Sequence, residues 1–290
     1  MISKTSEYMT KKTETLKVVQ LEMLNKLLSV CNKYNLKIFA DGGTLLGTIR
    51  HKGYIPWDDD IDMAMLREDY DKLRMIASKE FSSPYFFQCL DTEKGPYANG
   101  HAQIRKDDTT AIISRDTYIS KKIHKGIFID IFVFDEMPNN EIKRLSMITH
   151  IRKEMNLLKK RMCYSRLAYP FRYSKIRDYI RYYISQDKFY QRGLKLREYV
   201  LSFSSKENEF VCPIFFRQEE DFIKRHTFRK DWYKAILMLP FEDIMIPVPV
   251  EYDKILTQKY GDYMTPVHEN TMHGGYVIID TEKSYKEYGF

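Results

Sequence analysis

Cysteine, glycine and proline are all scarce in this chain of 290 residues, which contains 4 Cys, 12 Gly and 10 Pro. The four cysteines lie far apart and form no Cys-x-x-Cys pair, so neither a disulfide framework nor a zinc site is expected. No apolar run approaches the roughly 20 residues that span a bilayer, and the polar residues 1–17 do not resemble a secretory signal. We therefore expect a cytoplasmic protein whose membrane contact, if any, is peripheral at the inner membrane surface.

Charge is unevenly distributed along the chain. Residues 141–200 contain 16 Lys or Arg and only 5 Asp or Glu, whereas the whole chain has a net charge of +7. A basic segment attached to a mildly acidic body favours a polyanionic partner. The segment is rich in tyrosine but contains no recognisable nucleic-acid module, so no nucleic-acid partner is expected.

The hydrophobic pattern predicts an α/β (α+β) fold with a mixed sheet and flanking helices. Helices are expected at 14–33, 44–50, 67–78 and 251–260. Short strands are expected at 37–41, 61–66, 85–89, 101–106, 109–114 and 126–134. We expect a catalytic core at 1–138, a basic, aromatic-rich helical region at 139–205, and a C-terminal segment at 206–290 that packs back on the core. The last 20 residues are expected to form a polar tail.

An acidic cluster, Asp58-Asp59-Asp60-Ile61-Asp62, stands just before an apolar strand. Because side chains alternate along a strand, Asp60 and Asp62 would point to one side and Ile61 into the core. Such crowded carboxylates need solvent, protonation or a cation. Asp130 interrupts another apolar strand, where a carboxylate is costly unless it is paired or metal-bound. Asp60, Asp62 and Asp130 are therefore candidate catalytic residues and ligands of Mg²⁺ or Mn²⁺ in a phosphoryl- or nucleotidyl-transfer site.

A second signal precedes the acidic cluster. Gly42, Gly43 and Thr44 break a short strand and open a predicted helix, whose free N–H groups could hold a phosphate. Arg50 lies about two helical turns further on and is a candidate phosphate clamp. His51 is a candidate phosphate contact, because no pair of histidines has the spacing of a zinc site.

Other interpretations of these residues remain open. The acidic run could be a solvated turn, although an apolar strand follows it at once. An EF-hand calcium loop beginning at Asp58 is rejected, because its sixth position is Met63 rather than Gly and its twelfth is Asp69 rather than Glu. The glycine pair alone could be an ordinary turn, and Asp130 could be the structural partner of a buried Arg or Lys.

The longest specific stretch of this sequence resembles the signature of the LicD family. It reads ADGGTLLGTIRH at 40–51 and GYIPWDDDID at 53–62, followed by GIFIDIF at 126–132 and YGDYM at 260–264. The family includes bacterial phosphocholine transferases and is similar to the fukutin-related ribitol-phosphate transferases. Residues 36–74 carry the strongest resemblance, and the rest of 14–135 and 240–275 fit more loosely. Residues 141–200 show no recognisable motif.

The resemblance implies a nucleotidyltransferase-like fold in which Asp60 and Asp62 form the carboxylate pair and Asp130 is the third carboxylate. On the same basis, Asp58 is a further candidate metal ligand. The family transfers a phospho-alcohol from a CDP-linked donor to a glycan hydroxyl. The chain would then move phosphocholine from CDP-choline, or a similar group from another CDP-alcohol, to a cell-surface glycan such as teichoic acid or lipopolysaccharide, and release CMP.

Tyr54, Trp57 and Arg105 are candidate substrate contacts. A quaternary ammonium favours an aromatic cage, which contributes about 0.5–2 kcal/mol per face. Further candidates for its walls are Tyr85, Tyr97, Phe128 and Phe132. Each of these aromatic residues could equally belong to the core, so the pattern favours choline over ribitol, glycerol or ethanolamine without establishing it.

Residues 172–184 have the pattern of an amphipathic basic helix, with Arg177 and Arg181 beside its apolar face. Such a helix could lie on an anionic membrane or hold a lipid-linked, polyanionic acceptor, or it could dock on the core with a solvated rim. Two other functions remain open. One is a nucleotidyltransferase acting on a small molecule or RNA, and the other is a non-catalytic glycan- or membrane-binding protein. The presence of all three carboxylates argues against the second.

Overall fold

The computed structural model of the chain describes residues 4–93, 99–114, 116, 123–162, 186–266 and 276–290. The first elements are α1 Lys4–Lys33, β1 Phe39–Ala40, α2 Gly42–His51, β2 Asp62–Leu66, α3 Arg67–Glu80, β3 Tyr85–Gln88, β4 Ala102–Lys106, β5 Thr110–Ile113 and β6 Phe128–Met137. Then follow α4 Glu141–Met162, α6 Gln186–Leu201, β7 Phe210–Cys212, α7 Glu220–His226, β8 Phe228–Arg229, η2 Lys230–Tyr233, β9 Ile236–Phe241, β10 Ile244–Pro249, α8 Tyr252–Tyr260, β11 Tyr276–Asp280 and η3 Tyr285–Tyr288.

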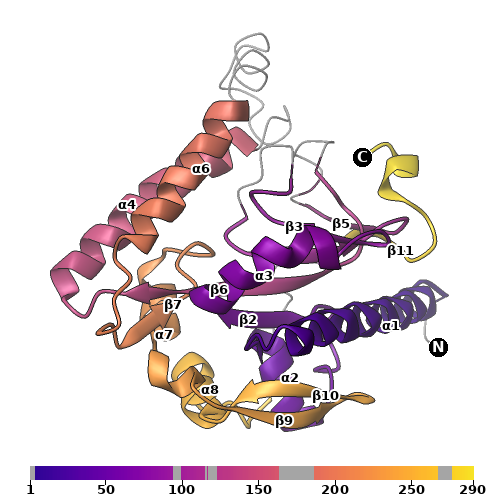
Figure 1. The fold of residues 1–290 in the computed structure, drawn as a ribbon. Coiled ribbons are helices and arrows are strands. Elements are labelled where there is room, and N and C mark those ends of the chain that lie inside the picture. Colours follow the sequence, from indigo (N-terminus) through magenta and orange to yellow (C-terminus); the bar gives the residue numbers. More distant parts are fainter. Residues whose placement is uncertain (1–3, 94–98, 115, 117–122, 163–185, 267–275) are drawn as a thin grey trace.

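One mixed sheet forms the centre of the molecule (Figure 1). Its strands follow the order β1-β2-β6-β4-β3. Strand β7 pairs with the C-terminal end of β6, and β8 pairs with β7. The pair β2 and β6 is parallel, whereas the other neighbours are antiparallel. The predicted α+β fold with a mixed sheet and flanking helices is therefore confirmed.

Helix α1 packs its apolar face on this sheet. Leu16, Met23, Leu24 and Leu27 recur at helical spacing and are fully buried. Both α1 and α3 contact β6, which is the central strand. Burial between two helices and two neighbouring strands fixes the position of β6, and with it the position of Asp130.

The C-terminal part of the chain contributes to the same core. Phe241, Ile246 and Val248 from the β9–β10 hairpin are fully buried in it. The prediction of a polar C-terminal tail was wrong. Tyr276–Asp280 form β11, which pairs antiparallel with β5, and the 3-10 helix η3 follows. Ile279 is the one buried side chain of this strand and Val277 is exposed, so the strand lacks the apolar alternation that would mark it in the sequence.

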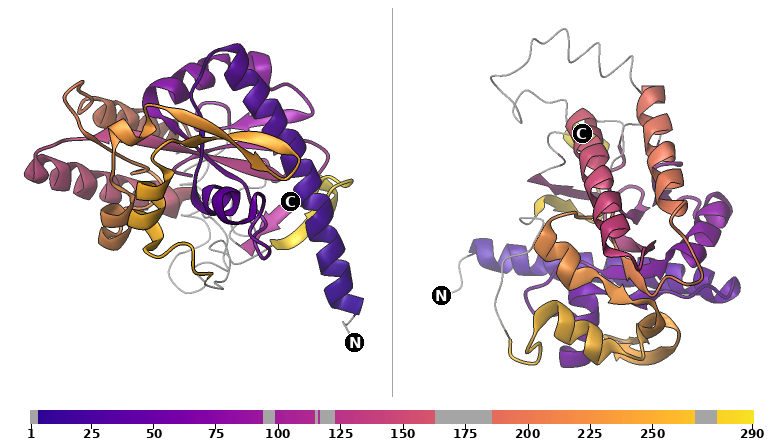
Figure 2. Two further views of the ribbon diagram at one scale, coloured as in Figure 1. Left: turned by 90° about the horizontal axis from the view of Figure 1, so that it is seen from below. Right: turned by 90° about the vertical axis from the view of Figure 1, so that its left-hand side faces the viewer.

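Helices α4 and α6 form an arm that extends from the sheet at the end opposite the β9–β10 hairpin (Figures 1 and 2). The arm has a second apolar cluster, which includes Met137, Ile151, Phe189, Leu196 and Ile214. The predicted basic helix at 172–184 lies outside the described residues. No helix in the described part of the chain combines the length and the apolar character needed to cross a bilayer.

Two half-buried histidines are expected to make the fold sensitive to acid. Burial lowers the pKa of His124 and of His226 from the ordinary 6.5 to about 4. Gly126 N–H donates to His124 Nδ1 at 3.1 Å, and His124 Nε2 lies 3.0 Å from Asp107 Oδ1, which fits a neutral ring. Below the ordinary pKa the unfolded chain binds the proton more readily than the folded chain. The stability contributed by each neutral ring is therefore present above pH 6.5 and is lost as the pH falls toward 4.

We expect urea unfolding midpoints to fall between pH 7 and pH 4.5, and to fall less in His124→Gln. His150 is exposed, so His150→Gln is the matched control and should keep the slope of the wild type. An unchanged slope in His124→Gln would assign the acid sensitivity to other groups.

Candidate active site

The carboxylates predicted from the sequence meet where β2 and β6 lie side by side. The parallel register places Asp62 opposite Asp130, and the antiparallel register of β4 places Gln103 on the other side of Asp130. Ile61 is fully buried, as predicted. Residues in register on neighbouring strands point to the same face of a sheet. Asp62, Asp130 and Gln103 therefore form a row across three strands.

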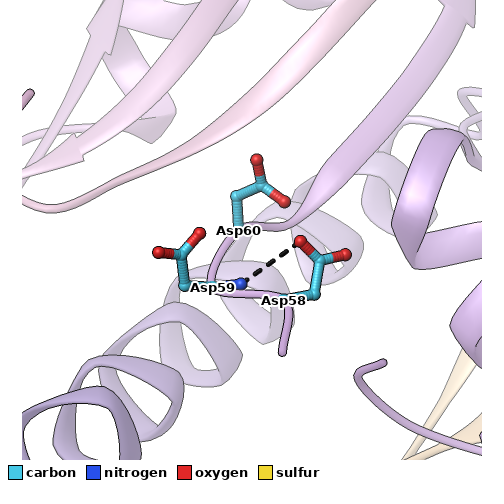
Figure 3. Close-up of side chains that lie close together, drawn as sticks. All are labelled: Asp58, Asp59 and Asp60. Carbon is cyan, nitrogen blue, oxygen red and sulfur yellow. Dashed lines mark hydrogen bonds between the residues drawn. The ribbon is translucent and has the colours of Figure 1, made fainter. Parts of the chain in front are cut away.

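The loop before β2 adds a second group of carboxylates. Carboxylate oxygens of Asp58, Asp59 and Asp60 all lie within 4.8 Å of one another (Figure 3). Asp59 was not among the predicted metal ligands, and its neighbourhood became visible only in the structure. Burial raises the pKa of Asp60 well above its ordinary value, and the charges of Asp62, Asp58, Asp130 and Asp59 raise it further. Asp60 therefore interacts both with the other loop carboxylates and with Asp62 and Asp130 on the strands.

Asp130 differs electrostatically from its two partners. Burial raises the pKa of Asp62 well above its ordinary value, and the charge of Asp130 adds to this effect. Burial would also raise the pKa of Asp130, but His101, Gln103 and Arg105 together lower it below the ordinary value. Asp130 is consequently the carboxylate that the protein itself keeps ionised, whereas Asp60 and Asp62 require another positive charge.

The glycine pair at the start of α2 allows the carboxylates to come close to the helix. Gly42 has φ +55°, and a Cβ placed there would lie 2.5 Å from Asp62 Oδ2. A Cβ at Gly43 would lie 2.2 Å from Asp58 Oδ2. Any larger residue would collide with these carboxylates. Thr44 contributes as well, because its Oγ1 accepts a hydrogen bond from Asp62 N–H at 2.8 Å. The predicted phosphate contacts of these three residues remain a prediction.

A buried ion pair supports the same turn from the other side. Asp41, directly before α2, accepts a hydrogen bond from Lys259 Nζ at 3.0 Å, and both side chains are only 8% exposed. The charge of Lys259 also acts on Asp62. No local pattern in the sequence predicts this pair, although Asp41 lies in one segment that carries the family resemblance and Lys259 directly precedes another. Lys259 is one cation beside the acidic cluster, and Lys17, whose charge acts on Asp58, is a second.

Arg50 and His51 lie at the opposite end of α2 from the glycine pair. Arg50 Nη1 donates to the carbonyl oxygen of Tyr263 at 3.0 Å, and Arg50 Nε lies 3.1 Å from His51 Nε2. With a rise of about 1.5 Å per residue, α2 separates them from the helix N-terminus by roughly 12 Å. The structure thus does not place these two residues beside the carboxylates, and their phosphate role stays a prediction.

The three predicted substrate contacts have different surroundings in the structure. Tyr54 is buried beneath Lys17, and its hydroxyl lies 3.1 Å from Gln20 Oε1. Trp57 is half-buried and packs against the main core. Arg105 is 2% exposed and donates to three protein oxygens at 2.7–2.8 Å, so its guanidinium is already occupied within the protein.

Two residues of β4 and its start contact Asp130 and were missed in the sequence. Gln103 Nε2 donates to Asp130 Oδ1 at 2.6 Å, and His101 Nε2 lies 3.1 Å from the same oxygen. The available signal was an alternation, since His101, Gln103 and Arg105 are polar residues at every second position of a predicted strand. One face of that strand therefore had to carry buried polar groups with partners of their own.

The donor set fits a hard divalent cation. Mg²⁺ and Mn²⁺ prefer carboxylate oxygens, and Asp58, Asp60 and Asp62 supply these without a sulfur or imidazole ligand. Burial combined with like charge keeps the pKa values of these three carboxylates raised. A bound cation would remove the repulsion that causes part of this shift.

Carboxylates on two adjacent parallel strands of a mixed sheet, beside a glycine pair that opens a helix, define a nucleotidyltransferase-type α+β domain. Comparison with known families agrees, because residues 35–173 match the model of the LicD/FKTN/FKRP nucleotidyltransferase domain.

One relative extends the similarity beyond this domain. The chain is 28% identical to the lipopolysaccharide cholinephosphotransferase LicD of Haemophilus influenzae, over 85% of this chain and 89% of that protein. It is also 32% identical to an uncharacterized protein of Rickettsia prowazekii, over 41% of this chain and 40% of that protein. Residues 35–173 thus carry the LicD-family domain, and similarity to a LicD protein extends over most of the chain.

Proposed function

We propose that this protein is a metal-dependent transferase that moves phosphocholine from CDP-choline to a hydroxyl of a cell-surface glycan and releases CMP. The Haemophilus influenzae relative is named a cholinephosphotransferase and is similar along most of both chains, which supports this choice of reaction. Lipopolysaccharide is the acceptor class that the name of this relative suggests. Teichoic acid, a lipid-linked acceptor and contact with an anionic membrane are further proposals.

The observation that carries the proposal is the position of Asp60. Its carboxylate is half-buried among those of Asp58, Asp62 and Asp130, and their charges add to burial in raising its pKa. A protein that only bound glycans would have no need for this repulsion, which opposes folding. A cation-dependent site needs carboxylates this close together, because they bind the metal. The cluster therefore supports an enzyme rather than a degenerate site.

Different residues of the chain would bind the cation and accept the proton during transfer. Asp60, Asp62 and Asp130, with Asp58 beside them, would hold Mg²⁺ or Mn²⁺, which would neutralise the charge of the pyrophosphate. The acceptor oxygen attacks the choline-side phosphorus, the bond from that phosphorus to the bridging oxygen breaks, and CMP leaves with the electron pair. Asp130, the carboxylate kept ionised by His101 and Gln103, takes the proton of the attacking hydroxyl.

The choice of choline rests on the relative rather than on an aromatic cage. Among the described candidates, the ring of Phe128 already faces Arg105 at 4.4 Å, and Phe132 packs against His101. The hydroxyl of Tyr85 donates to Glu22 Oε1 at 2.6 Å. Tyr97 lies outside the described residues.

Release of CMP from CDP-choline, with Mg²⁺ and with EDTA, tests the proposal. CDP-ribitol, CDP-glycerol and CTP serve as parallel donors, and purified lipopolysaccharide as an acceptor. We expect Mg²⁺-dependent release from CDP-choline, faster with the acceptor than without it, and none in EDTA. Turnover of CDP-ribitol or CDP-glycerol alone would replace choline while keeping the reaction class. Turnover of CTP alone would contradict the transferase and favour nucleotidyl transfer.

A further inference from the structure

Asp130 is held through one of its two carboxylate oxygens. Gln103 Nε2 donates to Oδ1 at 2.6 Å, and His101 Nε2 lies 3.1 Å from that same oxygen. Both contacts come from β4 or from the residue just before it. Strand β4 pairs with β6, and Gln103 lies opposite Asp130 in that pairing. The amide hydrogen bond and the adjacent imidazole ring at this one oxygen restrict the rotation of the carboxylate, and they leave Oδ2 as the oxygen that they do not contact.

The orientation of the Gln103 amide is itself determined by its other neighbour. Arg105 Nη2 donates to Gln103 Oε1 at 2.7 Å. A guanidinium has only donors, so the amide oxygen must face Arg105 and the amide NH₂ must face Asp130. A flipped amide would present its oxygen to a carboxylate and its NH₂ to a cation, which loses both hydrogen bonds.

Arg105 has little freedom to release this amide. It donates to Gln88 Oε1 and to the carbonyl oxygen of Gly126, each at 2.8 Å, and its guanidinium lies 4.4 Å from the centre of the Phe128 ring. Arg105 is 2% exposed and Gln103 is 1% exposed, so solvent does not compete for these contacts. The hydrogen-bonded series from Arg105 through Gln103 to Asp130 is therefore rigid, and the donor and acceptor of each hydrogen bond are fixed.

We propose that Arg105 and Gln103 are positioning residues that set the carboxylate of Asp130 for its work in the site. Arg105 fixes the amide, the amide together with His101 holds Oδ1, and Oδ2 is thereby presented to the cation and the attacking hydroxyl. This inference rests on the proposed function for the role of Asp130. It replaces the sequence-based view of Arg105 as a substrate contact, because all of its hydrogen bonds described here are to protein oxygens.

Binding of Mg²⁺ to the donor-free, full-length protein, measured by titration calorimetry, tests the proposal together with kcat and KM for CDP-choline. In Gln103→Leu the dissociation constant for Mg²⁺ should rise about tenfold to a hundredfold, the usual effect of removing an outer partner of a metal ligand. The kcat should fall while the KM for the donor stays constant, because Gln103 is buried. Arg105→Met should show a smaller loss of the same kind, and Arg105→Lys should restore part of it.

Two further variants separate positioning from loss of structure. Gln218→Leu is the matched control, since Gln218 is also a buried glutamine and donates to the carbonyl oxygen of Ile214, in the cluster beside the arm. It should lower the melting temperature without changing Mg²⁺ binding. Gln103→Asn keeps a polar side chain but is too short to bridge Arg105 and Asp130, so it tests the same contact if Gln103→Leu does not fold.

The outcomes distinguish this proposal from the proposed function. Wild-type affinity for Mg²⁺ and wild-type kcat in Gln103→Asn and Arg105→Met would overturn the positioning role and leave the transferase intact. A wild-type protein that binds no Mg²⁺ would overturn the metal site of the proposed function, and the positioning role with it. Weakened Mg²⁺ binding in the variants, beside normal binding in Gln218→Leu, supports both.

Discussion

Asp60→Asn should abolish transfer and, at the same time, stabilise the metal-free protein. The pKa of Asp60 is raised by burial and by four neighbouring carboxylates, so its charge opposes folding above its ordinary pKa. An uncharged amide of the same size removes this repulsion. In EDTA the melting temperature should rise by several degrees, since about 1 kcal/mol corresponds to roughly 2–4 °C at this chain length.

The effect on catalysis should have the opposite sign. Loss of a central metal ligand removes several kcal/mol of transition-state stabilisation, so kcat should fall about a thousandfold or more. Mg²⁺ should raise the melting temperature of the wild type and leave that of Asp60→Asn unchanged. Asp243→Asn makes the same chemical change at an exposed turn and should alter neither property. Full activity in Asp60→Asn would remove the acidic cluster from the mechanism.

Lys259→Met should be among the most destabilising single substitutions in the chain. The ammonium lies 3.0 Å from Asp41, and both side chains are 8% exposed. Its removal leaves a buried, unpaired carboxylate next to Asp62, and breaking such a pair costs about 3–5 kcal/mol. The unfolding free energy from urea titration should fall by this amount.

Two variants identify the cause of that loss. Lys254 lies on the same helix, in an exposed pair with Glu251, so Lys254→Met should change stability by less than about 1 kcal/mol. The double variant Asp41→Asn/Lys259→Met should recover much of the lost stability, because no unpaired charge remains. A double variant as unstable as Lys259→Met would show that packing of the lysine stem, rather than charge, holds the turn.

Local patterns were sufficient to predict the framework of the site. The helical spacing in α1 and the apolar strands that became β2 and β6 are properties of contiguous residues. The alternation of Asp60, Ile61 and Asp62 correctly predicted that Ile61 is buried. Patterns of this kind depend on the period of side chains along one element, and that period is visible in the sequence.

The contacts that complete the site depend on pairing between distant segments. Asp41 and Lys259 are 218 residues apart, and β4 meets β6 only because the sheet order departs from the chain order. Tyr54 and Arg105 were assigned to the substrate because their chemistry suits recognition. The sequence does not reveal that a side chain is buried and already hydrogen-bonded, and both residues are. Whether such a side chain is buried depends on which segments pair and pack around it, and this tertiary context is not visible in the local sequence.

The most direct test of the central claim is to hydrolyse CDP-choline in H₂¹⁸O with the full-length protein and Mg²⁺, without a glycan acceptor. Water then takes the place of the acceptor hydroxyl, and mass spectrometry shows which phosphorus it attacked. The account predicts ¹⁸O in phosphocholine and unlabelled CMP, because attack falls on the choline-side phosphorus. Label in CMP instead would mean attack on the cytidine side, and would contradict a phosphocholine transferase in favour of a nucleotidyltransferase.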